Sequence, residues 1–256
     1  MLESSFIILE GISYRKEQRL WEQGIRSWND FIAADAIPGI SSRSKSFYNR
    51  KLAEAKQQLA AENAGYFCDI LPSSQTWRLY ERFKDDAVFL DIETTGLSRQ
   101  DMLTVVGLYD GWSTKTMISQ INLNIPRLKQ TLSRYKLLVT FNGSSFDLPF
   151  LRKRYPGLIP HIPHLDIRTA SRIAGLDGGL KAIEKIFGLA RRKVIEDFHG
   201  GDAVLLWRMY KATGDDYYLN LLVEYNEEDV VNLKYIADAV VSSLKCQVYK
   251  PLAINP

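Results

Sequence analysis

Hydrophobic and polar residues follow different patterns in the two parts of the chain. Residues 16–28 place apolar side chains at helical spacing, and residues 30–36 continue the pattern until Pro38-Gly39 interrupts it. Residues 41–61 repeat the helical spacing, with basic residues at the start. No strong strand pattern occurs before residue 87. We therefore predict that the N-terminal segment is entirely helical.

From residue 87 the pattern changes to short apolar runs that are typical of buried strands. Strands are expected at residues 87–92, 103–109, 114–121, 137–141 and 165–168, with Asp110-Gly111 as a hairpin turn. Helices are expected at residues 125–135, 146–155, 180–188, 201–213 and 216–244. A meander of strands followed by strands that alternate with helices predicts an α/β fold, with a mixed sheet flanked by helices.

These two patterns indicate two domains. Residues 1–75 are expected to form a small helical accessory domain, and residues 85–250 the α/β domain. Of 256 residues, 46% are apolar and 25% are charged, which is ordinary for a globular protein with a sizeable core. No apolar run is long enough to span a bilayer, and residues 6–9 are too short a run for a signal peptide. We therefore expect a cytoplasmic protein.

Net charge and cysteine content restrict the chemistry. A formal net charge of +3 permits nucleic-acid binding without requiring it, and basic residues cluster at 43–51, 152–154 and 191–193. Cys68 and Cys246 match no metal or redox spacing, so two reduced thiols are expected. With only three histidines in the chain, a zinc site is not indicated. Any catalytic metal must therefore be bound mainly by carboxylates.

The end of the first predicted strand carries two acids, Asp91 and Glu93. Positions i and i+2 of a strand face the same side, so the two carboxylates point together. Carboxylates this close repel each other unless a cation neutralises them, and oxygen ligands favour Mg²⁺ or Mn²⁺. Two exposed acids at a strand end would give the same short pattern, so both interpretations remain open at this point.

Two further acids stand in comparable positions. Asp147 lies near the start of the helix expected at 146–155. The helix dipole favours an acid there, but it does not explain the whole string N-G-S-S-F-D-L-P. On the last predicted helix, Tyr225 and Asp229 are four residues apart and share one face. A solvated acidic face with a half-buried tyrosine would give the same pattern.

Together, the three stretches resemble the motifs of the DEDD exonuclease superfamily, whose members include proofreading domains of DNA polymerases. D-I-E-T-T-G-L at 91–97 is similar to its first motif, N-G-S-S-F-D-L-P at 142–149 to its second, and Y-N-E-E-D at 225–229 to the Y-x-x-x-D motif of its tyrosine branch. Residues 179–188 are similar to a stretch of the YprB-like ribonuclease H-like family. The resemblance covers about residues 85–245. It implies a ribonuclease H-like fold and a 3′→5′ exonuclease that hydrolyses DNA or RNA.

The resemblance also implies roles for individual residues. The catalytic set would be Asp91, Glu93, Asp147, Tyr225 and Asp229, and its four carboxylates would bind two divalent cations, Mg²⁺ or Mn²⁺. Asp91 would bridge both cations, Glu93 and Asp229 would complete the first site, and Asp147 would serve the second. Tyr225 would orient the attacking water, and the cations would activate it and stabilise the leaving 3′ oxygen. The residues that bind substrate would be Thr94, Thr95, Gly96, Leu97, Asn142 and Phe146.

His161 and Asp166 offer a competing third motif, because they have the H-x-x-x-x-D spacing of the histidine branch. They follow Asp147 too closely, and Pro160 and Pro163 rule out an ordinary helix carrying both residues. The assignment to Tyr225 and Asp229 is therefore preferred.

Several basic and glycine-containing stretches allow two interpretations. Three basic residues could contact phosphates or be solvated surface, namely Arg168, Arg172 and Lys181. Gly24-Ile25 and Gly39-Ile40 resemble the turns of helix-hairpin-helix modules, which bind nucleic-acid backbones. A helical domain that only packs on the nuclease explains them equally well. The basic residues within 43–51 favour backbone binding.

The expected partner is nucleic acid, either DNA or RNA, single-stranded or at 3′ ends. A structure-specific endonuclease on the same fold is an alternative, because the metal chemistry does not dictate end recognition. A non-catalytic nucleic-acid-binding module is a second alternative. Four mutually repelling acids argue against that module, since they are hard to explain without a metal.

Overall fold

The protein is described by a computed structural model that covers residues 1–96, 98, 100–198 and 200–249. Its centre is a five-stranded sheet in the order β3-β2-β1-β4-β5. The strands are β1 (Ala87–Thr94), β2 (Leu103–Tyr109), β3 (Thr114–Ile118), β4 (Leu137–Thr140) and β5 (His164–Asp166). The first three form an antiparallel meander, whereas β4 pairs in parallel with both β1 and β5. The predicted mixed sheet of an α/β fold is confirmed.

Helices precede the sheet and cover it. The N-terminal segment contains η1 (Leu2–Ser4), α1 (Tyr14–Glu22), α2 (Trp28–Ala33), α3 (Ser42–Ala60), α4 (Tyr66–Ile70), η2 (Ser73–Leu79), α5 (Tyr80–Phe83) and η3 (Lys84–Asp86). The helices that follow β1 are α6 (Ile125–Leu132), α7 (Asp147–Arg154), α8 (Ile167–Ile173), α9 (Leu180–Ile186), α10 (Gly200–Thr213) and α11 (Asp216–Tyr249). Helices alone form the regular elements before β1, as predicted. In the part of the chain that the structure describes, no helix is both long and apolar enough to cross a membrane.

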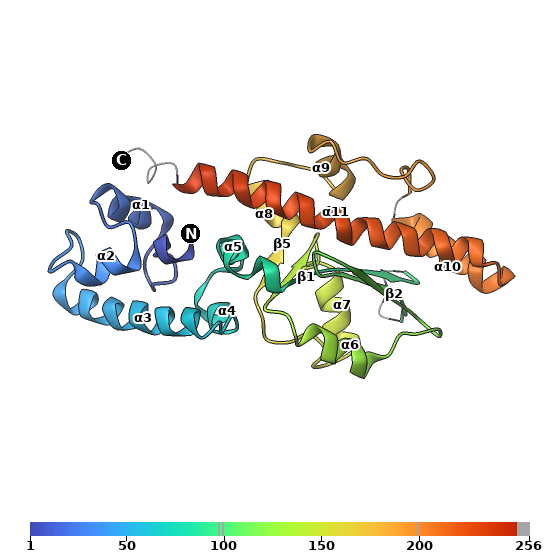
Figure 1. The fold of residues 1–256 in the computed structure, drawn as a ribbon, viewed down its shortest axis with the longest axis horizontal. Helices are drawn as coiled ribbons and strands as arrows, with labels where there is room; N and C mark the ends of the chain where they lie inside the picture. The colour runs from blue at the N-terminus through green and yellow to red at the C-terminus, as the bar shows by residue number, and fades with distance from the viewer. Residues whose placement is uncertain (97, 99, 199, 250–256) are drawn as a thin grey trace.

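The two faces of the sheet are covered by different helices. Val88, Leu90 and Ile92 of β1 belong to a hydrophobic cluster with residues of α6 and α7. Ala87 and Phe89 point to the opposite face and belong to a cluster with α11. Figure 1 shows α6 and α7 below the sheet and α11 running above it. Because side chains alternate along a strand, Asp91 and Glu93 continue the series of Ala87 and Phe89 and lie on the face covered by α11.

The helical spacing of residues 16–28 is interrupted in the structure. Helix α1 ends at Glu22, and Gly24 adopts a φ of +85°, a conformation that glycine accepts more readily than other residues. Helix α2 then begins at Trp28, where Ser27 accepts a hydrogen bond from a backbone N–H of the first turn. The apolar pattern therefore continues across a turn that separates two helices.

The strand expected at residues 165–168 was predicted too long. Strand β5 ends at Asp166, because this side chain caps α8 by accepting a hydrogen bond from the backbone N–H of Arg168. Apolar residues on both sides of the junction concealed the change from strand to helix.

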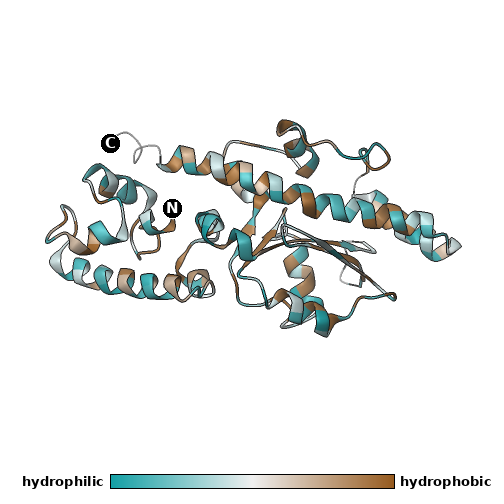
Figure 2. Cartoon of the chain, viewed as in Figure 1, coloured by the Kyte–Doolittle hydropathy of each residue, from teal (hydrophilic) through white to brown (hydrophobic). Residues whose placement is uncertain are grey.

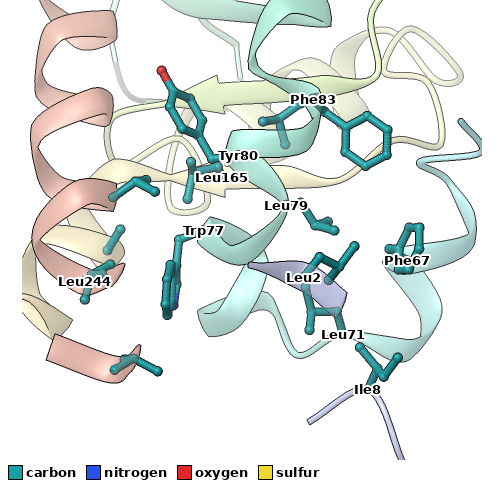
Figure 3. Packing of buried hydrophobic residues seen from close by; sticks show 14 of the residues in the cluster. Leu2, Ile8, Phe67, Leu71, Trp77, Leu79, Tyr80, Phe83, Leu165 and Leu244 are labelled. Carbon is teal, nitrogen blue, oxygen red and sulfur yellow. The ribbon is translucent and has the colours of Figure 1, made fainter. Parts of the chain in front are cut away.

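The N-terminal helices share a hydrophobic cluster with one end of α11. Figure 3 shows Leu2, Trp77 and Tyr80 packed in one region with Leu165 of β5 and Leu244 of α11, and all of these belong to the same cluster. In Figure 2, brown hydrophobic segments are frequent in the sheet, whereas α3 is mostly teal. One buried apolar cluster therefore connects the first residues of the chain with the last turns of α11. Burial of this kind stabilises the folded state by roughly 25 cal/mol per Å² of apolar surface removed from water.

Candidate active site

Three acids come together where α11 crosses β1. Asp91 and Glu93 lie on β1, and Asp229 lies on α11. One carboxylate oxygen from each residue lies within 4.8 Å of the others. The period of two along the strand accounts for the first pair, and the crossing of α11 adds the third acid.

A glycine permits this crossing. Gly107 pairs with Asp91 across β1 and β2, and a Cβ atom at position 107 would lie 2.1 Å from Oδ1 of Asn226 on α11. Any larger residue would therefore push the helix or the asparagine away. In the observed position, Nδ2 of Asn226 donates a hydrogen bond of 2.8 Å to Oδ2 of Asp91. This bond connects the helix directly to the acidic strand, and sequence reasoning did not identify Asn226.

Asp147 lies beside the three acids. It is the first residue of α7, and its Oδ1 accepts a hydrogen bond of 3.3 Å from the backbone N–H of Ile92, between the two acids of β1. Burial raises the pKa of Asp147 to about 7, although backbone N–H groups lower it. The structure thus brings all four predicted carboxylates to one cleft, with Asp147 outside the group of three.

Burial and mutual repulsion make these carboxylates difficult to ionise together. Burial raises the pKa values of Asp91 and Glu93 well above the usual range of carboxyl groups. The nearby carboxylate of Asp229 raises both pKa values further. Burial also raises the pKa of Asp229 to about 6, against the effect of the Arg191 guanidinium. A hard divalent cation matches this all-oxygen donor set and would relieve the repulsion. The residues present therefore fit Mg²⁺ or Mn²⁺ better than a softer metal.

The acids form part of a cleft of about 790 Å³. Its lining includes Thr94, Asn142 and Phe146, three of the predicted substrate-binding residues. Thr95 and Gly96 are not among the described residues that line it. Leu97 lies outside the described residues. Apolar walls complete the cleft, formed in part by Phe141, Leu180 and Val204.

Contacts with Asp101 account for the position of Thr95 and Gly96 outside the lining of the cleft. The Thr95 hydroxyl donates a hydrogen bond of 2.8 Å to Oδ1 of Asp101. A Cβ atom at Gly96 would lie 2.8 Å from the other oxygen of the same carboxylate. The close neighbour that favours glycine at this position is therefore a side chain of the β1–β2 loop. Sequence reasoning did not identify Asp101.

Asp166 organises the loop that follows β4. Its carboxylate accepts hydrogen bonds from the backbone N–H groups of Asn142, at 2.9 Å, and Ser144, at 3.0 Å. Asn142 has a φ of +62°, and its side-chain oxygen accepts a hydrogen bond of 2.9 Å from Nη1 of Arg168. His161, the other member of the competing motif, is 69% exposed and lies 3.7 Å from Asp69. His161 and Asp166 thus have separate surroundings. Asp166 holds the loop that contains Asn142, a residue of the cleft lining.

The three basic residues near the cleft differ in their surroundings. Lys181 donates hydrogen bonds to the backbone carbonyls of Glu196 and Phe198. Arg172 is largely exposed and lies 3.8 Å from Asp177. Arg168 lines the cleft that contains the four acids, whereas Lys181 lines a neighbouring hollow together with Tyr225 and Asp229 and lies over the Tyr225 ring.

Tyr225 occupies the position on α11 one turn before Asp229 and lines the same cleft. Burial raises the pKa of its hydroxyl above the usual value, and the carboxylates of Asp229, Glu93 and Asp91 raise it further. The hydroxyl therefore remains protonated at neutral pH and can donate a hydrogen bond into the cleft.

Arg191 and Glu184 are the main additions that the structure makes to the predicted site. Arg191 was expected within a basic cluster at 191–193, but its side chain is only 3% exposed. It contacts Glu184 of α9 and Asp229 of α11. In the sequence, Glu184 belongs to the stretch 179–188, and Arg191 belongs to the basic cluster that follows it. Sequence spacing alone does not pair them with a residue some 40 positions later, at 229.

Comparisons with known proteins bear on the fold that carries this site. A family of the RNase_H superfamily matches residues 88–241, well over half of the 256 residues. No curated protein matches the chain. The family B DNA polymerase from the hyperthermophilic archaeon Pyrobaculum calidifontis is similar in structure, with a TM-score of 0.50 and 15% identity. That likeness covers 60% of this chain and 24% of the polymerase, and at this identity it concerns the fold alone.

A second solved structure, described as the apo form of the nuclease, has a TM-score of 0.47 and 22% identity, and covers 68% of this chain and 85% of its own. The extent of the family match decides the assignment, because it includes the whole sheet from Val88 onward and most of α11. With its mixed five-stranded sheet, its flanking helices and an acidic cluster inside the matched region, the chain belongs to the RNase_H superfamily.

Proposed function

We propose that the protein is a 3′→5′ exonuclease of the DEDDy type, which hydrolyses phosphodiester bonds of DNA or RNA with two divalent cations, Mg²⁺ or Mn²⁺. The observation that carries this proposal is the meeting of Asp91, Glu93 and Asp229 within 4.8 Å. The position of Tyr225 one helical turn before Asp229 gives it further support. A purely structural role would not require mutually repelling acids in one buried place.

Asp91, Glu93, Asp147 and Asp229 would hold the cations. When bound, the cations would supply activation of water and stabilisation of the leaving 3′ oxygen. The Tyr225 hydroxyl would donate a hydrogen bond that orients the attacking water or a phosphate oxygen, and its raised pKa keeps it protonated for this role. In this role Tyr225 is a positioning donor and not a general base.

The cleft supports a single-stranded 3′ end as substrate. Its apolar wall, including Phe141 and Phe146, offers surfaces on which bases can pack without sequence preference. Arg168 at the same cleft supplies a positive charge for a phosphate of the strand. Thr94 and Asn142 line the same cleft.

We further propose that residues 1–75 form an accessory helical domain and residues 85–250 the exonuclease domain. A hollow of about 290 Å³ on the helical part is lined by Lys16, Arg19 and the Gly39-Ile40 turn. The positive charges of Lys16 and Arg19 beside this glycine turn are compatible with contact to a phosphate backbone. This contact would hold the substrate while its end occupies the cleft.

The test is degradation of 5′-labelled single-stranded and double-stranded DNA and RNA, with Mg²⁺ or Mn²⁺ and with chelator. Wild type is compared with Asp91→Asn and with Asp177→Asn, whose 92% exposed carboxylate lies outside the acidic cluster. We expect a ladder that shortens from the 3′ end, requires metal, persists in Asp177→Asn and disappears in Asp91→Asn.

Other products would contradict the proposal in distinguishable ways. Discrete internal fragments that depend on Asp91 would establish an endonuclease on the same site. Absence of cleavage by the wild type, with binding of any of these strands retained, would establish a non-catalytic binding module.

A further inference from the structure

The segment between α9 and α10 places a buried arginine against the acidic cluster. Nε of Arg191 donates to Oε2 of Glu184 at 2.8 Å, and Nη2 donates to Oε1 at 2.7 Å. Nη2 also donates a hydrogen bond to Oδ1 of Asp229. The exposed fractions of the three side chains are 3% for Arg191, 3% for Glu184 and 9% for Asp229. One guanidinium therefore bridges a helix outside the cluster to a proposed cation ligand inside it.

The outer end of this bridge is anchored. Oε1 of Glu184 also accepts a hydrogen bond of 3.0 Å from Nδ2 of Asn232. Asn232 lies on α11, three residues after Asp229, and so belongs to nearly the same helix face. Glu184 is thus held by two donors, and its position is tied to the helix that carries Asp229.

Arg191 and Glu184 form a neutral pair with the two-point geometry that arginine and carboxylate favour. Asp229 therefore receives a directed hydrogen bond without a full extra positive charge that would repel a cation. The guanidinium also lies over the ring of Tyr225, with 5.5 Å between its carbon and the ring centroid. Arg191 consequently contacts both members of the Y-x-x-x-D motif.

We propose that Arg191, with Glu184 as its fixed counter-ion, is a positioning residue that orients Asp229 for cation binding. This inference rests on the proposed function, because it assumes that Asp229 is a cation ligand. A ligand held in its binding orientation loses little freedom when the cation arrives. Removing such an outer partner typically weakens metal affinity about 10–100-fold.

The experiment measures Mn²⁺ binding to the full chain by calorimetry and by the electron spin resonance signal of free Mn²⁺. Arg191→Met alone leaves Glu184 buried without its cation, which can destabilise the fold. The double variant Arg191→Met/Glu184→Gln removes both charges and avoids that penalty. The control is Arg192→Gln, because the neighbouring arginine is 72% exposed and pairs with Glu224. Thermal unfolding of each variant checks that it is folded.

We expect the double variant to remain folded and to bind Mn²⁺ about 10–100-fold more weakly than wild type, with Arg192→Gln unchanged. Arg191→Lys should also weaken Mn²⁺ binding, because a point-like ammonium lacks the planar fork with which the guanidinium binds Glu184 at two points while it also donates to Asp229. Wild-type affinity in Arg191→Lys would overturn the orienting role in favour of simple charge.

Wild-type affinity in the folded double variant would also overturn the inference, and tighter binding would instead make Arg191 a competitor of the cation. In these cases the wild type still binds Mn²⁺ and cleaves, so the proposed function stands. Failure of the wild type itself to bind Mn²⁺ would contradict the cation site and, with it, the inference.

Discussion

Two buried arginines show how the N-terminal region and the site region of this protein use charge differently. Arg78 of η2 donates to Glu17 of α1 at 2.9 Å, and also to Ser5, Gln75 and Tyr249. Arg191 donates to Glu184 and Asp229, but its Nη1 has no hydrogen-bond partner among the described residues.

The surroundings of the two arginines explain the difference. The Arg78–Glu17 pair is fully buried, with both side chains 0% exposed, and Glu17 also accepts hydrogen bonds from the backbone N–H groups of Phe6 and Ile7. Arg191 instead lies beside acids that exceed its own charge. The Arg78 network is fully hydrogen-bonded and links Ser5 near the start of the chain to Tyr249 of α11, whereas the acids around Arg191 leave an excess of negative charge.

The largest effect is expected from breaking the Arg78 network. Arg78→Met should lower the free energy of unfolding by about 3–5 kcal/mol, because it leaves the Glu17 carboxylate buried without its cation. Urea denaturation measures this loss, with the midpoint and slope analysed separately. Mn²⁺ affinity of the remaining folded protein should not change. A loss below about 1 kcal/mol would mean that the buried Arg78–Glu17 pair does not stabilise the fold.

In the absence of metal, the free energy of unfolding should depend on pH because of the buried acids of the cleft. Asp147 and Asp229 have folded-state pKa values of about 7 and about 6, above the ordinary 3.8. The folded state therefore binds protons more tightly than the unfolded state, and stability is lost as pH rises from about 4 through about 7.

Bound Mn²⁺ should offset this loss, so the increase in Tm caused by Mn²⁺ should grow with pH across the same window. Differential scanning fluorimetry with and without Mn²⁺ measures it, and Asp229→Asn should flatten the dependence. An increase in Tm that is constant with pH would show that these carboxylates do not bind the ion.

A smaller effect on stability is expected at the glycine that lets α11 approach. Gly107→Ala introduces a Cβ that would lie 2.1 Å from Oδ1 of Asn226, so it should cost about 1–3 kcal/mol through overpacking. Because the displaced Asn226 also bonds Asp91, cleavage should decrease more than stability does. Gly175→Ala is a matched control, since its φ of +84° adds backbone strain but its Cβ would meet nothing within 4 Å. Equal activity losses in both variants would contradict a specific role for position 107.

The smallest effect on stability is expected at an exposed ion pair. Lys51 and Glu54 form an ion pair at 3.1 Å on α3, with side chains 47% and 43% exposed. Lys51→Gln should change the free energy of unfolding by less than about 0.5 kcal/mol, because water and salt screen the pair. Chemical denaturation in low and high salt measures it. A loss comparable to that of Arg78→Met would show that burial is not what distinguishes these pairs.

The features that sequence predicted well are those set by neighbouring residues. The alternation along β1 placed Asp91 and Glu93 on one side, and the spacing of four placed Tyr225 and Asp229 on one helix face. Helices α3 and α6 were also expected within a few residues of their observed ends. Backbone geometry repeats over two to four residues, so the local order of side chains is enough to predict such features.

Contacts between distant segments depend on the tertiary structure and could not be predicted from local patterns. Arg191 was expected in a basic cluster, and its burial against Glu184 and Asp229 depends on how the segment after α9 folds back onto α11. The contact of Asn226 with Asp91 likewise depends on Gly107 of another strand. Sequence periodicity determines which side of an element a residue faces. The packing of helices on the sheet determines what that side meets, because shape and burial act between residues far apart in the chain.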